Sequence, residues 1–146
     1  MNQAAYARAL RILLARPHFE GELRNKLLAK GISEEDISPI LEDLKKRKYI
    51  NDDEQVELYI NELSRKGFGS YKIVNKLAQK GFDFEKAQSL VNRLFPKELE
   101  KENLINFLQK KRINPRELTD IKDKKKLFDS LKSKGFSTEL IMEFIR

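Results

Sequence analysis

Cysteine is absent from this 146-residue chain, histidine occurs once, and no apolar run approaches the length of a membrane span. The absence of cysteine excludes disulfides and thiolate metal sites, and it fits a reducing compartment. Because the N-terminal residues lack the hydrophobic core of a signal peptide, we expect a cytoplasmic protein that does not engage a membrane.

Catalytic and metal-binding patterns are also scarce. A lone imidazole, His18, cannot build a typical zinc site, and no serine or acid accompanies it in a recognisable catalytic motif. We interpret it as a partly exposed structural residue in the turn before a helix. The acidic run at residues 51–54 lacks the pattern of a calcium loop, and we expect Asp52 or Asp53 to cap the helix that follows. We therefore expect no enzyme, no metal site and no cofactor.

Helix-forming residues dominate what remains. Leucine, lysine, glutamate and isoleucine are abundant and strand formers are sparse, so we predict an all-α fold. Apolar residues recur at helical spacing in about nine segments, most of which end at a glycine or a proline. Ser33, Asp83 and Ser137 stand where the N-caps of three of these helices are expected.

One pattern occurs three times along the chain. Leu-x-x-Lys-Gly followed by an apolar residue begins at Leu27, Leu77 and Leu131. Each copy precedes a cap residue and another periodic helix, so we predict three-helix repeats at residues 1–49, 50–96 and 97–146. Such helix-turn-helix-like units stack into an elongated or curved body whose long faces are usually binding surfaces. A compact bundle with accidental periodicity is the alternative.

Positive charge prevails, and the net charge is +7. This charge favours a polyanionic partner such as nucleic acid or a nucleoprotein surface, although a well-solvated helical surface also explains it. Lys72, Lys76 and Lys80 are spaced by four residues and line one helix face just past a Gly67-Phe68-Gly69 corner. A basic stripe beside an aromatic residue and two glycines can approach phosphates closely. The corner is a weak nucleotide-binding motif, because it follows a predicted helix rather than a strand.

An ordered set of motifs occupies the middle of the chain: Tyr49-Ile50-Asn51-Asp52, then Tyr59, then Arg65-Lys66-Gly67-Phe68-Gly69, with Lys80-Gly81 after it. Together with the opening segment at residues 9–31, these motifs resemble the RecX family of bacterial regulators of the RecA recombinase. The resemblance covers essentially the whole chain and is strongest over residues 9–94. The chain departs from the family pattern at Phe19, where a serine often caps the second helix, and at Gln55-Val56, where an aromatic-alanine pair is common.

The resemblance implies a non-enzymatic protein of tandem three-helix units that binds RecA, especially its DNA-bound filament. It also implies suppression of ATP hydrolysis, strand exchange and co-protease activity, and hence control of recombinational DNA repair and the SOS response. Some members of the family bind DNA as well, and we expect a monomer. A direct DNA-binding protein that uses its helix-turn-helix-like units is the alternative hypothesis. The residues that we expect to contact RecA, or single- or double-stranded DNA, are Arg65, Lys66, Phe68, Lys72, Lys76, Arg16 and Arg24.

Overall fold

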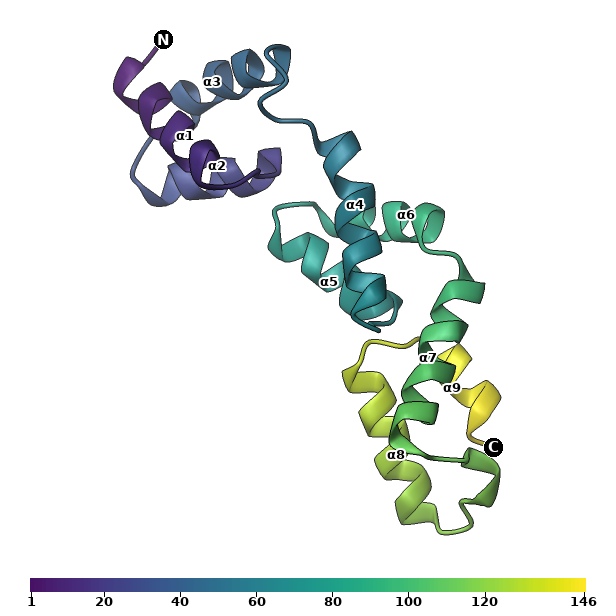
Figure 1. The fold of residues 1–146 in the computed structure, drawn as a ribbon. Coiled ribbons are helices and arrows are strands. Elements are labelled where there is room, and N and C mark those ends of the chain that lie inside the picture. Colours follow the sequence, from purple (N-terminus) through teal and green to yellow (C-terminus); the bar gives the residue numbers. More distant parts are fainter. The chain divides into compact units, whose positions relative to one another are not determined.

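The computed structural model describes all 146 residues and contains nine α-helices, one short 3-10 helix and no strand (Figure 1). The prediction of an all-α fold is therefore confirmed. None of the helices combines the length and the apolar character that crossing a membrane requires. In chain order the elements are α1 (Gln3–Ala15), α2 (Glu20–Ala29), α3 (Glu34–Lys46), α4 (Asp52–Arg65), α5 (Ser70–Gln79), α6 (Phe84–Leu94), α7 (Lys97–Lys111), the 3-10 helix (Pro115–Glu117), α8 (Ile121–Ser133) and α9 (Thr138–Phe144).

Helix boundaries follow the local signals in the sequence. The three glycines of the repeated pattern, Gly31, Gly81 and Gly135, have φ of 85°, 97° and 90°, the left-handed conformation that ends a helix. The predicted N-caps also hold. The Ser33, Asp83 and Ser137 side chains accept hydrogen bonds from the backbone N–H groups of Asp36, Lys86 and Leu140.

The chain divides into two compact units. The first comprises Met1–Val56 and Ala78–Phe82, and the second comprises Glu57–Leu77 and Asp83–Arg146. This division follows the packing of the helices rather than the predicted repeat boundaries near residues 49 and 96, which remain a prediction about the sequence repeats.

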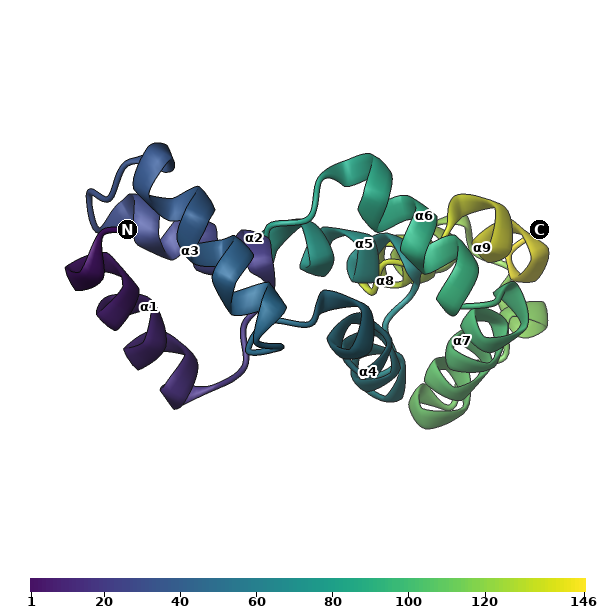
Figure 2. The same cartoon turned by 90° about the horizontal axis from the view of Figure 1, so that it is seen from above.

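The core of the first unit lies between α1, α2 and α3, which are neighbours in both ribbon views (Figure 1 and Figure 2). Helix α1 enters this core with two small residues, Ala5 and Ala9, which are buried and allow close approach of its backbone. The other helices contribute fully buried aliphatic side chains: Leu23 and Leu27 from α2, and Ile37, Ile40, Leu41 and Leu44 from α3. Burial of each such side chain contributes roughly 1.5–3 kcal/mol.

The N-terminus of α2 is held by a side chain from α4. The backbone N–H of Glu20 donates to Oδ1 of Asp52 at 2.9 Å, which supplies the oxygen that Phe19 cannot offer. The expectation that Asp52 or Asp53 caps its own helix is wrong. Oδ1 of Asn51 accepts the hydrogen bond from the N–H of Glu54, at 3.3 Å, and so leaves Asp52 for α2.

The second unit has a core between α7, α8 and α9, filled by Leu104, Leu131, Phe136 and Ile141, which are fully buried. The N-terminus of α5 packs against the turn between α8 and α9. The N–H of Gly69 donates to the Lys134 carbonyl at 3.0 Å, and the N–H of Tyr71 donates to the Gly135 carbonyl at 2.8 Å. A Cβ atom at Gly69 would lie 2.5 Å from the Cα of Phe136, so only glycine allows this approach.

Candidate functional site

The corner before α5 holds a partly buried aromatic ring that two cations approach. The Nζ atoms of Lys72 and Lys134 each lie 5.4 Å from the centroid of the Phe68 ring. An ammonium group over an aromatic face is stabilised by roughly 0.5–1 kcal/mol at exposed sites. Lys72 comes from the first turn of α5 and Lys134 from the end of α8, so residues distant in the sequence share one ring.

This ring lies at the edge of an open basic groove in the second unit. Two adjoining hollows of about 670 and 310 Å³ have Phe107, Lys110 and Lys134 in common. We define the basic groove by the cations and aromatic rings that line these hollows: Arg65, Lys66, Lys72, Lys110, Lys111 and Lys134, with Phe68 and Phe107.

Little negative charge balances these six cations. Asp129 is the one acidic side chain that lines the hollows, and it already forms an ion pair with Lys125 at 3.0 Å. Lys66 pairs with Glu62 one helical turn away at 3.6 Å, where both side chains are more than half exposed. Exposed pairs of this kind contribute little, so the groove retains a strongly positive character.

A buried asparagine fixes the groove's geometry. Nδ2 of Asn103, on α7, donates to the backbone carbonyls of Ser64 and Phe68, each at 3.1 Å. These bonds join α7 to the end of α4 and to the corner, while Ser70 N–H donates to Oε2 of buried Glu100 at 2.5 Å. The α7 cations thereby lie beside those of the corner, which makes the groove chemically suited to a polyanion.

The predicted site residues fall into separate groups. Arg65, Lys66, Phe68 and Lys72 all line the basic groove. Lys76 lies one turn farther along α5, is partly buried and does not line it. Sequence reasoning missed four groove residues. Lys134 had been assigned only to the repeated Leu-x-x-Lys-Gly pattern. Lys110 and Lys111 stand in a run of three basic residues that could have drawn attention to them, whereas nothing marked Phe107.

Arg16 and Arg24 belong to the first unit, and both are engaged by carboxylates. Nη2 of Arg16 lies 2.5 Å from Oε2 of Glu22. Arg24 forms ion pairs with Glu34 and, at 3.8 Å, with Glu20. Their role in binding a partner remains a prediction.

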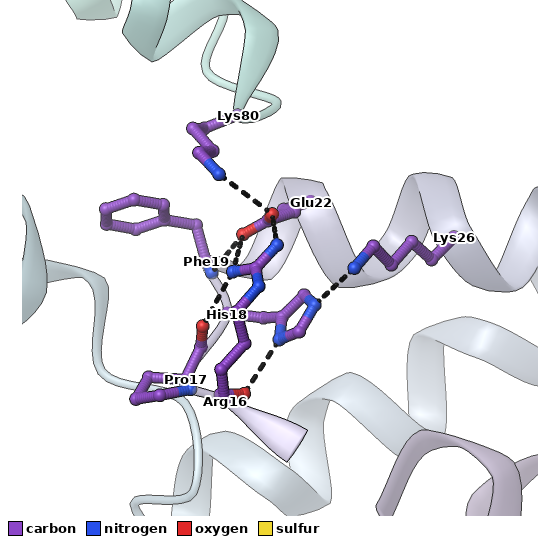
Figure 3. A network of polar contacts seen from close by, with 7 residues as sticks. All are labelled: Arg16, Pro17, His18, Phe19, Glu22, Lys26 and Lys80. Atoms are coloured by element: carbon purple, nitrogen blue, oxygen red, sulfur yellow. Dashed lines mark hydrogen bonds and ion pairs between the residues drawn. The ribbon is translucent and has the colours of Figure 1, made fainter. Parts of the chain in front are cut away.

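Around Glu22 the structure builds a joint between α1, α2 and the turn after α5 (Figure 3). Nζ of Lys80 lies 3.3 Å from Oε2 of Glu22, on the other side from Arg16. Burial alone raises the pKa of Glu22, but hydrogen bonds from Arg16 and Lys80 outweigh it and lower that pKa to about 2. Lys80 therefore stabilises the fold through its ion pair with Glu22. Contrary to the expectation, it does not extend the basic stripe of Lys72 and Lys76.

His18 is buried in the same joint, so the expectation of a partly exposed residue is wrong. Its Nδ1 lies 2.9 Å from the Arg16 carbonyl, and its Nε2 lies 2.6 Å from Nζ of Lys26. A carbonyl only accepts and an ammonium only donates, which assigns the proton to Nδ1 of a neutral ring. Burial lowers the pKa of His18, in agreement with this neutral state. Local sequence could not reveal this burial, because it depends on how α1 and α2 pack.

No group of three or more histidine, aspartate or glutamate side chains is arranged to hold a metal ion. What the basic groove offers is positive charge and aromatic surface.

Known proteins match the chain over most of its length. The family model for the first three-helix domain of RecX matches residues 5–44, and the model for the third three-helix domain matches residues 98–145. The Regulatory protein RecX of Pelodictyon phaeoclathratiforme is 33% identical over 140 residues, which is 94% of this chain and 84% of that protein. The chain belongs to the RecX family. The resemblance seen in the sequence motifs is thus confirmed.

Two other RecX proteins support this family assignment. The Regulatory protein RecX of Clostridium beijerinckii is 36% identical over 141 residues, and the chain spans 65% of that protein's length. The crystal structure of RecX from Lactobacillus salivarius has a TM-score of 0.79 at 26% sequence identity, over 97% of this chain and 92% of that one. The shared name of these relatives supports a regulatory role.

The register of the sequence repeats relates the joint at Glu22 to the basic groove. Because Leu27 corresponds to Leu77, Glu22 corresponds to Lys72. Lys80 and Lys134 are equivalent in the same way, since each precedes the glycine of the repeated pattern. In the first unit this pair of positions forms an ion pair. In the second unit both positions hold lysine, and the two cations share the Phe68 ring instead.

Proposed function

We propose that this protein is a non-enzymatic regulator that binds RecA and its DNA-bound filament. In this proposal, binding lowers the ATP hydrolysis, strand exchange and co-protease activity of RecA, and so modulates recombinational DNA repair and the SOS response. Membership of the RecX family supports the choice of partner. The single observation on this chain that carries the proposal is the basic groove with its nearly unbalanced cations.

The mechanism is electrostatic docking followed by steric restraint. A filament that contains DNA presents closely spaced phosphates, and cations that neutralise them release condensed counterions. Six cationic side chains in the basic groove provide this attraction, and Phe68 and Phe107 add flat apolar surface between them. A helical body held against the filament would then restrict the subunit movements that accompany turnover.

The test is the single-strand-dependent ATP hydrolysis of RecA, measured with increasing amounts of the purified protein. We expect wild-type protein to lower the hydrolysis rate at stoichiometric ratios, and to co-sediment with RecA filaments. The variant Lys72→Glu with Lys110→Glu should require at least about tenfold more protein for the same effect, because it reverses two of the cations that neutralise phosphates.

Two exposed lysines outside the basic groove provide a matched control. The variant Lys86→Glu with Lys122→Glu changes the net charge equally and should inhibit like wild type, since neither residue lines the hollows. Unchanged ATP hydrolysis with wild-type protein would refute the proposed function. Equal loss in both double variants would instead show that only net charge matters.

Direct DNA binding is a second candidate function, and the aromatic rings among the groove cations favour it. Sites for single strands combine a positive groove with aromatic side chains on which bases stack. This function predicts binding to bare DNA that weakens steeply as the salt concentration rises, and an effect that does not need RecA. Fluorescence anisotropy of labelled single strands at several salt concentrations, without RecA, distinguishes the two.

A further inference from the structure

An apolar groove lies on the first unit, and its lining differs chemically from that of the basic groove. It is about 610 Å³ in volume and runs between α1 and the segment that follows α3. We call it the N-terminal apolar groove and define it by its lining residues: Tyr6, Leu10, Leu13, Leu14, Arg47 and Tyr49. The four α1 residues recur at helical spacing, so they form one stripe along the helix.

One side of this stripe packs against the core, since Tyr6, Leu10 and Leu13 are partly buried against the cluster that contains Ala5 and Ala9. The other side of the groove is open. Leu14 remains 85% exposed and Tyr49 remains 55% exposed. Large apolar side chains that gather on one exposed surface, rather than singly, are typical of an interaction site.

The surroundings of the groove select the charge of its occupant. Helix α1 has no acidic residue in its first turn or elsewhere, while Arg11 lies one turn before Leu14 on the exposed side. The carboxylate of Asp43 is already used by two lining residues: Tyr6 Oη donates to it at 2.7 Å and Arg47 Nε at 3.0 Å. The groove is therefore an apolar surface with a basic edge, and its complement is an apolar surface with an acidic edge.

We propose that the N-terminal apolar groove binds an amphipathic helix of a partner protein whose apolar stripe is flanked by carboxylates. The stripe from Tyr6 to Leu14 spans nine residues of α1 and rises by roughly 12 Å, which matches two turns of a partner helix with anchors at i, i+3, i+4 and i+7. A second copy of this chain is a poorer occupant, because a symmetric contact would place the same basic edge against itself.

The proposal concerns a different surface and a different chemistry from the basic groove, so it stands apart from the function proposed above. The probe is a fluorescein-labelled synthetic helix of about 16 residues, with leucines at the four anchor positions and glutamates beside them. A comparison peptide carries lysines in place of the glutamates. Binding of each peptide to the full chain is measured by fluorescence anisotropy at low and high salt.

The main variant is Leu14→Gln, which removes the most exposed side chain of the groove without touching the core. Its matched control is Ile121→Gln, because Ile121 on α8 is 81% exposed and lies outside the groove. Arg11→Glu tests the basic edge. We expect the acidic peptide to bind wild type and Ile121→Gln alike, and to bind Leu14→Gln and Arg11→Glu about tenfold more weakly.

Other results would overturn the proposal. Equal binding of the acidic and basic peptides would remove the role of charge. A concentration-dependent dimer that Leu14→Gln disrupts, without peptide binding, would assign the groove to a second copy. Binding to phosphatidylglycerol vesicles that Leu14→Gln abolishes, again without peptide binding, would assign it to a lipid surface. Absence of all three interactions would show that the groove has no such occupant.

Discussion

Replacing Lys72 by glutamate should weaken polyanion binding while the fold becomes slightly more stable. The Nζ atoms of Lys72 and Lys134 each lie 5.4 Å from the Phe68 centroid, so at most twice 5.4 Å separates the two positive charges. Two unit charges about 10 Å apart in water interact with roughly 0.4 kcal/mol. The variant turns this repulsion into attraction, a difference of about 0.8 kcal/mol at low salt.

Two further effects act on the same residue. Lys72 occupies the first turn of α5, which contains no acidic side chain, and a carboxylate there gains about 0.5 kcal/mol from the helix dipole. Loss of the cation over Phe68 removes about 0.5 kcal/mol. The sum predicts that the free energy of unfolding rises by roughly 0.5–1 kcal/mol at low salt, and by less at physiological salt.

Urea unfolding followed by circular dichroism measures the stability, and inhibition of RecA ATP hydrolysis measures the function. Lys80→Glu is the equivalent reversal in the first unit, where it would place a second carboxylate beside nearly buried Glu22. We expect that variant to lose roughly 1–3 kcal/mol. A loss of more than about 1 kcal/mol in Lys72→Glu would refute the electrostatic reasoning. Inhibition of RecA equal to that of wild type would refute the functional assignment of the groove.

Three other predictions concern the fold. Gly69→Ala should lose about 2–3 kcal/mol in urea unfolding, because its Cβ would meet the Phe136 backbone at 2.5 Å and strain two backbone hydrogen bonds; a loss below 0.5 kcal/mol would contradict this contact. Asn103→Ala should lose about 2 kcal/mol by the same assay, since it leaves the buried carbonyls of Ser64 and Phe68 without their donor. Glu22 has a pKa of about 2 against an ordinary 4.5, so its stabilisation is complete above pH 4.5 and is lost as pH falls through about 2. Glu22→Gln should flatten stability against pH within that window, and an unchanged profile would exclude the joint as its cause.

The sequence predicted those features of the fold that depend on neighbours along the chain. Helix ends at Gly31, Gly81 and Gly135 need only the conformational freedom of glycine, which is a property of the residue itself. Capping by Ser33 or Asp83 spans three residues and is equally local. Half of the basic groove was predicted for the same reason, because four of its members lie within one short corner of the chain.

The rest of the site could not be predicted, because it depends on packing between segments that are distant in the sequence. Lys134 reaches Phe68 only when the turn after α8 meets the start of α5. Asp52 precedes a helix and so suggested a cap for α4, yet its carboxylate reaches the N-terminus of α2. Local sequence spacing does not distinguish a cap for α4 from a cap for α2, since both roles require the same residue type.

The same kind of hydrogen bond at a helix start occurs in both units, and it shows whether the fold requires the lysines of the basic groove. A carboxylate from a later helix accepts a hydrogen bond from the start of a middle helix: Asp52 from Glu20, and Glu100 from Ser70. A glycine turn packs beside each of these helix starts. Because a carboxylate at Glu22 satisfies this packing in the first unit, the packing itself does not require a lysine at the equivalent position, Lys72.

A lysine that the fold does not need, near a second lysine that repels it, is the arrangement that the proposed polyanion binding predicts. The first unit lacks this surplus, since Glu22 is already paired with Lys80 and Arg16. The same reasoning ranks the predicted contacts. Arg16 and Arg24 must release carboxylates before they can bind a phosphate, whereas Lys72 and Lys134 have only an aromatic ring to leave. Charge reversal should therefore weaken filament binding more at Lys72 than at Arg24.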